Sequence, residues 1–392
     1  MLHEAPAAAG WFNSVGLVFS VSLLLSLLLV WSRRWHGHLS MDGVDGVQKL
    51  HTAPVPRVGG LAVALALWLY WLVLASGWAG RPLLGPGDKL WLLLAAGLPA
   101  LAFGLLEDLT KRVGVLLRLA ATMASGVLAW WLTGFALTRV DVPGLDWLLG
   151  WLPLSVLFTA FAIGGVANAI NIVDGLNGLA GSTALWAALG YGLMALTLGD
   201  TALAAVCFLL AAAVLGFLVV NWPLGRLFMG DGGSYFVGFA LAWVAVLLVE
   251  RHSHISAFAV LTVLALPVIE VLFSVFRRMM RKDHPGQPDR LHLHSLLARR
   301  YVARWCKACS PTTRNSIAGV MVGSFTLLAA LLGYLTLFNP VAAPLVLLAL
   351  VVGYVLLYSR MVLHRWVTPW RFLRGVRKAG VAPRRSGVAR HP

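Results

Sequence analysis

The chain has 392 residues, of which 59% are hydrophobic and only 12% are charged. A water-soluble protein of this length could not bury so much apolar surface, so the composition excludes a soluble globular class. The formal net charge of +16 would suit a nucleic-acid binder. The basic residues, however, stand between apolar stretches rather than on one amphipathic surface, and nucleic acid is therefore not an expected partner.

Apolar stretches recur along the whole chain, and about 20 such residues suffice for a helix to cross a bilayer. We predict an all-α polytopic membrane protein with eleven transmembrane helices, over residues 12–31, 58–76, 90–106, 115–137, 151–173, 179–198, 201–220, 234–250, 255–276, 316–337 and 341–363. Residues 1–370 are expected to form a single transmembrane domain, and the basic tail over 371–392 to be disordered.

The distribution of Lys and Arg predicts the orientation in the membrane. Threading eleven spans puts 26 of the 31 basic residues on one face and four on the other. Basic loops stay in the cytoplasm, so the N-terminus is expected outside and the C-terminus inside.

Acidic residues are scarce, and several stand in short motifs at the mouth of a predicted span. These are Glu107 and Asp108 in GLLEDLTKR, Asp174 in NIVDGLNG and Asp231 in FMGDGGS. A carboxylate at a membrane boundary is unfavourable unless it pairs or binds a cation. A shared Mg²⁺ would remove this penalty, because Mg²⁺ prefers one or two carboxylates together with phosphate oxygens and water. The alternative is that each acid reaches water or pairs with a basic neighbour.

Glycines and asparagines accompany two of these carboxylates. The glycines around Asp231 allow a tight turn that presents backbone N–H groups at a helix start, which favours phosphate. Asn168 and Asn171 precede Asp174 by six and three residues, so all three share one stripe of a helix. The amides either contact a ligand or join neighbouring helices.

The loop after the ninth span combines cationic and imidazole groups in the sequence RRMMRKDHPGQPDRLHLHSLLARR. Such donors beside an acidic metal cluster suit a diphosphate whose charge changes during a reaction. Alternatively His292, His294, Cys306 and Cys309 form a zinc site, although their spacing matches the usual zinc motifs poorly.

Six collinear motifs carry a resemblance to a known family. They are KLHTAPVPRVGG (49–60), GLLEDLTKR, NAINIVDGLNGLAG (168–181), FMGDGGS, LPVIEVLFSVFRR (266–278) and PDRLHLHSLL (288–297). Together they resemble the bacterial polyprenyl-phosphate N-acetylhexosaminyl-1-phosphate transferases of glycosyltransferase family 4, from the second span to the tenth. The PDRxHxH pattern and the eleven spans favour the branch that starts O-antigen, enterobacterial common antigen or teichoic-acid linkage synthesis.

The resemblance implies a membrane-embedded transferase that moves HexNAc-1-phosphate from a UDP-HexNAc to undecaprenyl phosphate and releases UMP. It further implies Mg²⁺ as cofactor, with Mn²⁺ as a substitute, and an active site at the cytoplasmic face of the bacterial inner membrane. N-acetylglucosamine is the usual sugar of the family, while N-acetylfucosamine, N-acetylquinovosamine and N-acetylgalactosamine stay open. Single displacement and a two-step route through a phosphoryl-enzyme also stay open, and a homodimer is compatible with a helical bundle.

Site residues follow from the resemblance, position by position. The catalytic set is Glu107, Asp108, Asp174 and Asp231, and the Mg²⁺ ligands are Asp231, Asp108 and Asn171. The substrate-binding set is Lys49, His51, Asn168, Asn171, Asn177, Arg290, His292 and His294. Three positions depart from the family pattern: Glu107 replaces an Asp, Asn177 replaces the second Asp of DGxDG, and Ser295 replaces a third His.

Two other classes of function are compatible with acids in a helical membrane body. A transporter would place them near the bilayer midplane, where Glu270 is the candidate unless it pairs with Arg277 or Arg278. A catalytically inactive scaffold is the second alternative. The crowding of carboxylates on one face favours the enzyme.

Overall fold

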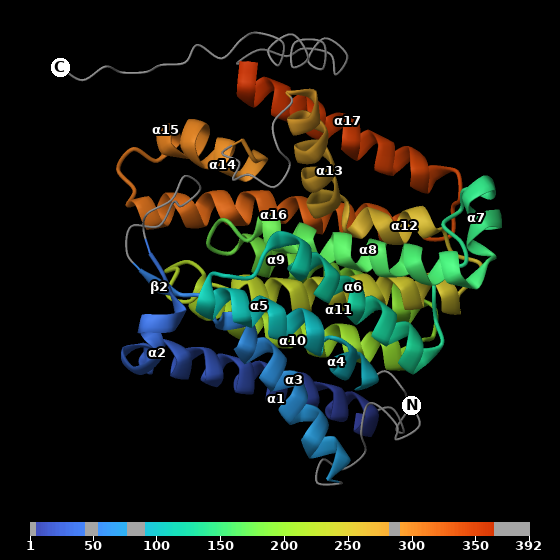
Figure 1. Ribbon diagram of the computed structural model, residues 1–392, viewed down its shortest axis with the longest axis horizontal. Helices are drawn as coiled ribbons and strands as arrows, with labels where there is room; N and C mark the ends of the chain where they lie inside the picture. The colour runs from blue at the N-terminus through green and yellow to red at the C-terminus, as the bar shows by residue number, and fades with distance from the viewer. Residues whose placement is uncertain (1–4, 44–53, 77–90, 282–290, 364–392) are drawn as a thin grey trace.

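The computed structural model describes residues 5–43, 54–76, 91–281 and 291–363, and these are mostly helical (Figure 1). The elements are α1 (Ala5–Trp31), α2 (Arg33–Ser40), β1 (Met41–Asp42), β2 (Val55–Pro56), α3 (Gly59–Ala75), α4 (Leu92–Ala96), α5 (Leu98–Thr110), α6 (Val115–Thr133), α7 (Pro143–Leu149), α8 (Leu152–Val173), α9 (Leu179–Thr197), α10 (Thr201–Asn221), α11 (Gly230–Arg251), α12 (Ala257–Val263), α13 (Ala265–Met280), α14 (Leu293–Leu297), a π-helical turn (Ala298–Val302), α15 (Ala303–Trp305), α16 (Pro311–Leu335) and α17 (Ala342–Leu363). The predicted tail, 371–392, lies outside the described residues.

Within the described residues, eight helices are long and apolar enough to cross a membrane, and a bent pair of helices raises the number to nine. The eight are α1, α6, α8, α9, α10, α11, α16 and α17. The described part of the chain is thus an all-α polytopic membrane protein, and the expected eleven spans are supported only in part. The second segment, α3, has 17 residues, and the third is divided into α4 and α5 at Gly97.

The ninth predicted span is broken rather than continuous. Its two halves, α12 and α13, meet at Leu264 with a bend of 83°. Pro267 explains the break, because its ring lacks an N–H and clashes with the carbonyl four residues earlier, at Val263, where α12 ends. In Figure 1, α13 consequently stands across the long helices instead of running along them.

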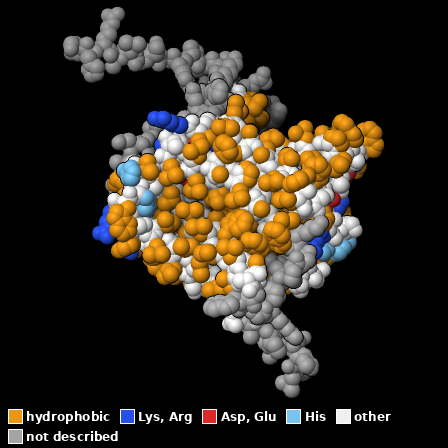
Figure 2. All heavy atoms as spheres, turned by 60° about the horizontal axis from the view of Figure 1, so that its bottom comes forward, with side chains coloured by type: hydrophobic (Ala, Val, Ile, Leu, Met, Phe, Trp, Pro, Cys, Tyr) orange, Lys and Arg blue, Asp and Glu red, His pale blue; other side chains and the backbone are white. Residues whose placement is uncertain are grey.

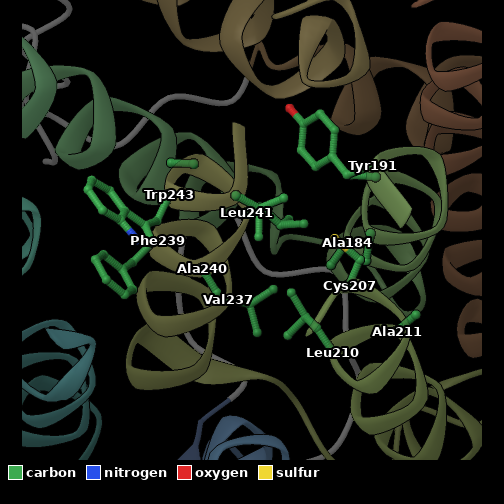
Figure 3. Packing of buried hydrophobic residues seen from close by; sticks show 14 of the residues in the cluster. Ala184, Tyr191, Cys207, Leu210, Ala211, Val237, Phe239, Ala240, Leu241 and Trp243 are labelled. Carbon is green, nitrogen blue, oxygen red and sulfur yellow. The ribbon is translucent and has the colours of Figure 1, made fainter. Parts of the chain in front are cut away.

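Helix α11 forms the centre of the bundle. In its most apolar window 94% of the residues are buried, and it packs against α3, α5, α8 and α9. Its side chains Val237, Phe239 and Trp243 lie in the core that Leu210 of α10 and Tyr191 of α9 complete (Figure 3). The polar first turn of α11 is therefore held at a fixed place by a large apolar body.

The bundle has two ends with different elements. The first residues of α11, together with α2, the antiparallel pair β1–β2 and α14, lie at what we call the Asp231 end. The last residues of α11 and helix α7 lie at the Arg251 end (Figure 1). A helix of 22 residues separates the two ends by about 33 Å, the thickness of a bilayer core.

The lateral surface is apolar. Figure 2 shows a broad orange face over which hydrophobic side chains dominate, while Lys, Arg and His gather at its edges. Large apolar side chains on the outer helices are exposed, among them Leu24, Trp131, Phe161 and Leu331. A surface of this kind is stable in lipid and not in water, so the chain is a multi-pass membrane protein.

Candidate active site

The site is built where α3 and α11 begin. The turn into α11 needs glycine at the first residue of the helix, Gly230, whose φ is +76°. The two helix starts then touch: a Cβ on Gly60 would lie 1.8 Å from the Cα of Gly233, and the Gly60 N–H donates to the Met229 carbonyl at 2.9 Å. This contact brings Arg57, just before α3, beside Asp231.

Asp108 holds the start of α11 in place. Its side chain is fully buried, its Oδ1 accepts from the backbone N–H of Asp231 at 3.0 Å, and its Oδ2 accepts from that of Gly232 at 2.9 Å. The first N–H groups of a helix have no partner within the helix, and a carboxylate suits both these donors and the helix dipole. Asp108 therefore fixes the direction in which Asp231 points.

Asp231 is the meeting point of three other segments. Its Oδ1 accepts from Arg57 Nη2 at 2.7 Å and from Asn171 Nδ2 at 2.9 Å, while its Oδ2 accepts from Arg118 Nη1. Asn171 Nδ2 also donates to Ser234 Oγ at 2.9 Å. The predicted residues Asp108, Asn171 and Asp231 thus come together, with two arginines that the prediction did not include.

Several carboxylates share the guanidinium of Arg57. Its Nη1 lies 3.4 Å from Asp42 Oδ1, and its Nε lies 3.5 Å from Asp108 Oδ1. Burial alone would lower the pKa of Arg57, yet the carboxylates of Asp231, Asp108, Asp42 and Asp174 raise it above its ordinary value. Three carboxylates therefore contact one largely buried cation.

Burial disfavours the charged form of two carboxyl groups in this cluster. Burial raises the pKa of Asp108 to about 7, against the opposing effect of Arg57 and with a further increase from Asp231. Burial likewise raises the pKa of Asp174 to about 7, with Arg57 opposing and Asp231 and Asp108 adding to the increase. Both groups would hold their charge better beside another cation.

The histidine motif reaches the same cluster from α14. The rings of His292 and His294 are parallel within 4°, with centroids 5.4 Å apart. A Cβ on Gly175 would lie 2.7 Å from His294 Nε2, so that ring packs on the backbone directly after Asp174. His292 Nδ1 lies 2.8 Å from Glu270 Oε1.

Three predicted residues form other contacts. Glu107 Oε2 accepts from the backbone N–H of Val113 at 2.8 Å and closes the turn after α5. Asn168 Nδ2 donates to Gly164 O at 2.7 Å and contacts Thr122 of α6 at 3.3 Å. Asn177, 3% exposed, donates from its backbone to Asn315 and from its amide to Ser316 of α16. The structure does not join these three to Asp231, and Lys49, His51 and Arg290 lie outside the described residues.

Sequence reasoning missed Arg57, Arg118 and Tyr235. Arg57 stands in the quoted KLHTAPVPRVGG motif without an assigned role, and Arg118 is the only basic residue in its apolar span. An arginine inside a membrane helix is unfavourable unless it is paired, and that was the available signal. Tyr235 OH contacts Asn171 Oδ1 at 3.4 Å, and nothing in the sequence distinguishes it from a packing tyrosine.

The donors at the Asp231 end fit a hard divalent cation. Carboxylate and amide oxygens of Asp108, Asp231 and Asn171 lie together there, and Mg²⁺ prefers oxygen ligands. Within the described residues no group of three or more Asp, Glu, His or Cys side chains is placed to hold a metal ion by itself. The described residues thus give no support to a zinc site among His292, His294, Cys306 and Cys309.

The fold and the site together define a membrane-embedded protein with a cluster of carboxylates and two arginines at one end of its helical bundle. The family model described as glycosyl transferase family 4 matches residues 90–249. The chain is 30% identical over 258 residues to the probable undecaprenyl-phosphate N-acetylglucosaminyl 1-phosphate transferase of Bacillus subtilis (strain 168), covering 64% of this chain and 67% of that protein.

Two further relatives extend the comparison. The undecaprenyl-phosphate alpha-N-acetylglucosaminyl 1-phosphate transferase of Escherichia coli (strain K12) is 26% identical over 368 residues, covering 92% of this chain and 94% of that protein. The phospho-N-acetylmuramoyl-pentapeptide-transferase of Moorella thermoacetica is 36% identical over 213 residues, covering 50% of this chain and 63% of that protein. The chain belongs to this family of polyprenyl-phosphate sugar-1-phosphate transferases.

Proposed function

We propose that the protein transfers a HexNAc-1-phosphate from a UDP-HexNAc to undecaprenyl phosphate, giving undecaprenyl-diphosphate-HexNAc and UMP. The observation that carries the proposal is the meeting of Asp108, Asp231, Arg57 and Arg118 at the first turn of α11, at one end of a bundle that spans a membrane. A lipid-anchored phosphate and a soluble nucleotide sugar can meet only at such a boundary. The relatives' names support undecaprenyl phosphate as the acceptor.

We place the reaction at the cytoplasmic face of a bacterial inner membrane, as the first step of a cell-surface polysaccharide such as O-antigen. The basic residues support this orientation, since 26 of 31 fall on the face of the Asp231 end in the predicted topology. N-acetylglucosamine is the sugar that the names of two relatives support.

The residues of the site account for the transfer by charge and position. The lipid phosphate oxygen forms a bond to the β-phosphorus of UDP-HexNAc, and the bond from that phosphorus to the oxygen of UMP breaks. Arg57 and Arg118 supply cations against the repulsion between the two anions. A phosphate is mostly dianionic at neutral pH, so direct attack needs no strong base.

Mg²⁺ is the cofactor that we propose, held by Asp231, Asp108 and Asn171. When bound, it would neutralise charge on the diphosphate and on the departing UMP, which is worth several kcal/mol in phosphoryl transfer. To bind the metal, Asp231 would give up its contact with at least one of its two arginine partners, Arg57 and Arg118. His292 and His294 are proposed to bind the phosphates or the sugar from the side of Asp174.

The test is a transfer assay with purified protein in lipid nanodiscs, undecaprenyl phosphate and radiolabelled UDP-HexNAcs. We expect UMP and a lipid-linked sugar with Mg²⁺, and none with EDTA. Failure with UDP-N-acetylglucosamine, UDP-N-acetylgalactosamine, UDP-N-acetylfucosamine and UDP-N-acetylquinovosamine would contradict the proposal and support a catalytically inactive scaffold. Release of UMP without acceptor lipid would indicate the two-step route.

Metal binding has a test of its own that does not need turnover. Titration of paramagnetic Mn²⁺ should show one tight site by electron paramagnetic resonance, competed by Mg²⁺. Asp231→Asn should lose that site, whereas Asp200→Asn, at the Arg251 end, should keep it. Equal binding by both variants would refute the ligand assignment.

A further inference from the structure

Glu270 is a buried charge for which the site described above gives no role. It lies on α13 three residues after the proline that bends the broken span, and it is 2% exposed. An ionised carboxylate at such a place is unfavourable unless its oxygens are fully hydrogen-bonded. The sequence left open a pairing with Arg277 or Arg278, and the structure gives a different answer.

Both oxygens of Glu270 are used, and two of the bonds go to the histidine motif. Oε1 lies 2.8 Å from His292 Nδ1 and accepts from the backbone N–H of Leu293 at 3.1 Å. Oε2 accepts from the hydroxyl of Tyr354, on α17, at 2.7 Å. One carboxylate thus fixes a ring, the first N–H of α14 and the distance between α13 and α17.

A second buried charge on α13, Arg277, binds Leu291, the residue before His292. Arg277, two turns after Glu270 and 2% exposed, donates from Nη1 to the Leu291 carbonyl at 3.1 Å and to the Tyr358 hydroxyl at 2.6 Å. Residues 291, 292 and 293 are therefore each bonded to α13.

Helix α17 braces both of these bonds. Tyr354 and Tyr358 are one turn apart, so they lie on the same face of α17, and their rings contact Phe273 of α13 with centroids 5.4 and 4.7 Å away. One tyrosine bonds to Glu270 and the other to Arg277. Helix α17 thus helps to position the histidine motif, although it contributes no residue to that motif.

We propose that Glu270, anchored by Tyr354, is a positioning residue that sets the orientation and the tautomer of His292 for the transfer. The inference rests on the proposed function, in which the His292–His294 pair faces the phosphates or the sugar. A carboxylate bonded to one ring nitrogen of a histidine fixes which nitrogen carries the proton and stops the ring from turning. The parallel stack with His294, which packs on Gly175 beside Asp174, carries this orientation to the acidic cluster.

The proposal predicts coupling between Glu270 and His292. Glu270→Leu should lower kcat by about 10–100-fold, the usual loss for a partner that orients a working histidine. KM for the nucleotide sugar should change little, since orientation matters most in the transition state. In a His292→Ala background the same Glu270→Leu change should cost less than about 3-fold, because the ring that it orients is gone.

Milder variants keep the test valid if Glu270→Leu does not fold. Glu270→Gln retains an oxygen that accepts from His292 and Leu293 and an amide that can donate to Tyr354, so it should lose less than about 5-fold in kcat. Tyr354→Phe removes one bond and should lose about 2–5-fold, again only when His292 is present. Matched controls are Glu250→Gln and Tyr334→Phe, which lie away from the motif and should retain kcat.

The outcomes separate this inference from the proposed function. A wild-type protein inactive with every UDP-HexNAc rejects the function before any variant is made. An active wild type in which the losses from Glu270→Leu or Tyr354→Phe are equally large with and without His292 overturns the inference and leaves the function standing. Losses that disappear in the His292→Ala background support it.

Discussion

The two ends of α11 use their charged side chains in different ways. At the Arg251 end, each of the described acids contacts at most one guanidinium group: Glu250 accepts from Thr138, and Asp200 caps α10 and contacts Arg251 and His252. Arg139 bonds to Asp141 and to three backbone carbonyls. These contacts close loops and helix ends.

At the Asp231 end the carboxylates are shared instead. Asp42, Asp108 and Asp231 contact a single guanidinium, and Asp231 contacts two guanidinium groups. Shared partners can be redistributed when an anionic substrate and a cation enter, whereas saturated local pairs cannot. The comparison indicates that a scarce charged residue in a membrane chain does not by itself mark a functional site. Carboxylates that share the same guanidinium groups are the better indication. Matched substitutions at the two ends test this difference.

The largest contrast is expected for Asp231→Asn against Asp200→Asn. Asp231→Asn removes a proposed metal ligand and should lower kcat by at least about 10³-fold. Asp200→Asn keeps an oxygen that can cap α10 but removes the ion pair with Arg251, so it should cost less than about 1 kcal/mol of stability with kcat retained. Steady-state kinetics and thermal unfolding of both proteins give the answer, and substantial turnover by Asp231→Asn would contradict the site.

The next contrast is Asp108→Asn against Asp146→Asn. Both aspartates accept from backbone N–H groups, Asp108 from two at α11 and Asp146 from Val140 at 2.7 Å. An Asn side chain has one acceptor oxygen, so Asp108→Asn would leave one N–H facing another donor and should cost about 1–3 kcal/mol. Because Asp231 would also shift, kcat should fall by about 10²-fold. Asp146→Asn should keep its bond and its kcat, and a comparable loss there would remove the distinction.

A smaller contrast is expected for Arg57→Lys against Arg251→Lys. The lysine keeps the charge but loses the fork that lets Arg57 contact Asp42, Asp108 and Asp231 together. We expect kcat/KM to fall about tenfold, a loss of about 1.4 kcal/mol in transition-state binding. Arg251→Lys should leave kcat/KM unchanged; measuring both with the same lipid and nucleotide sugar decides the matter.

The smallest effect on catalysis is expected for Arg139→Ala. Its guanidinium holds the carbonyls of Val249, His252 and Ile255, so its loss leaves buried acceptors without a donor and should lower stability by about 1–3 kcal/mol. The kcat of the folded fraction should stay within about twofold of wild type, since the change lies about 33 Å from Asp231. A large fall in kcat with normal unfolding would link the two ends.

Much of the helical pattern could be predicted from the sequence, because apolar length alone indicates a span. Pro267 also indicates the break at Leu264, but the continuous apolar sequence favoured an unbroken span. At the site, Asp108, Asn171 and Asp231 were predicted and meet, since glycines and carboxylates at helix ends carry a distinct signal. Asn168 and Asn177 were selected by the same reasoning and join helices instead, because an amide on an apolar helix serves either purpose.

The partners of the carboxylates were harder to predict. Which helix ends meet depends on packing between segments distant in the chain, and Arg57 and Arg118 reach Asp231 from 174 and 113 residues away. Periodicity carries no information on such pairings. Glu270 illustrates the same limit. Arg277 is nearer to it in sequence, but the Glu270 carboxylate contacts His292.

The crossing of α3 and α11 at Gly60 and Gly233 restricts how the chain can be altered. Alanine at residue 60 would place a carbon 1.8 Å from the neighbouring backbone, where real contacts are essentially never under 3.0 Å. The helices would have to separate by more than about 1 Å, and Arg57 would withdraw from Asp231 with them. Libraries that aim to change the accepted sugar should therefore vary the loops and leave this pair of glycines untouched.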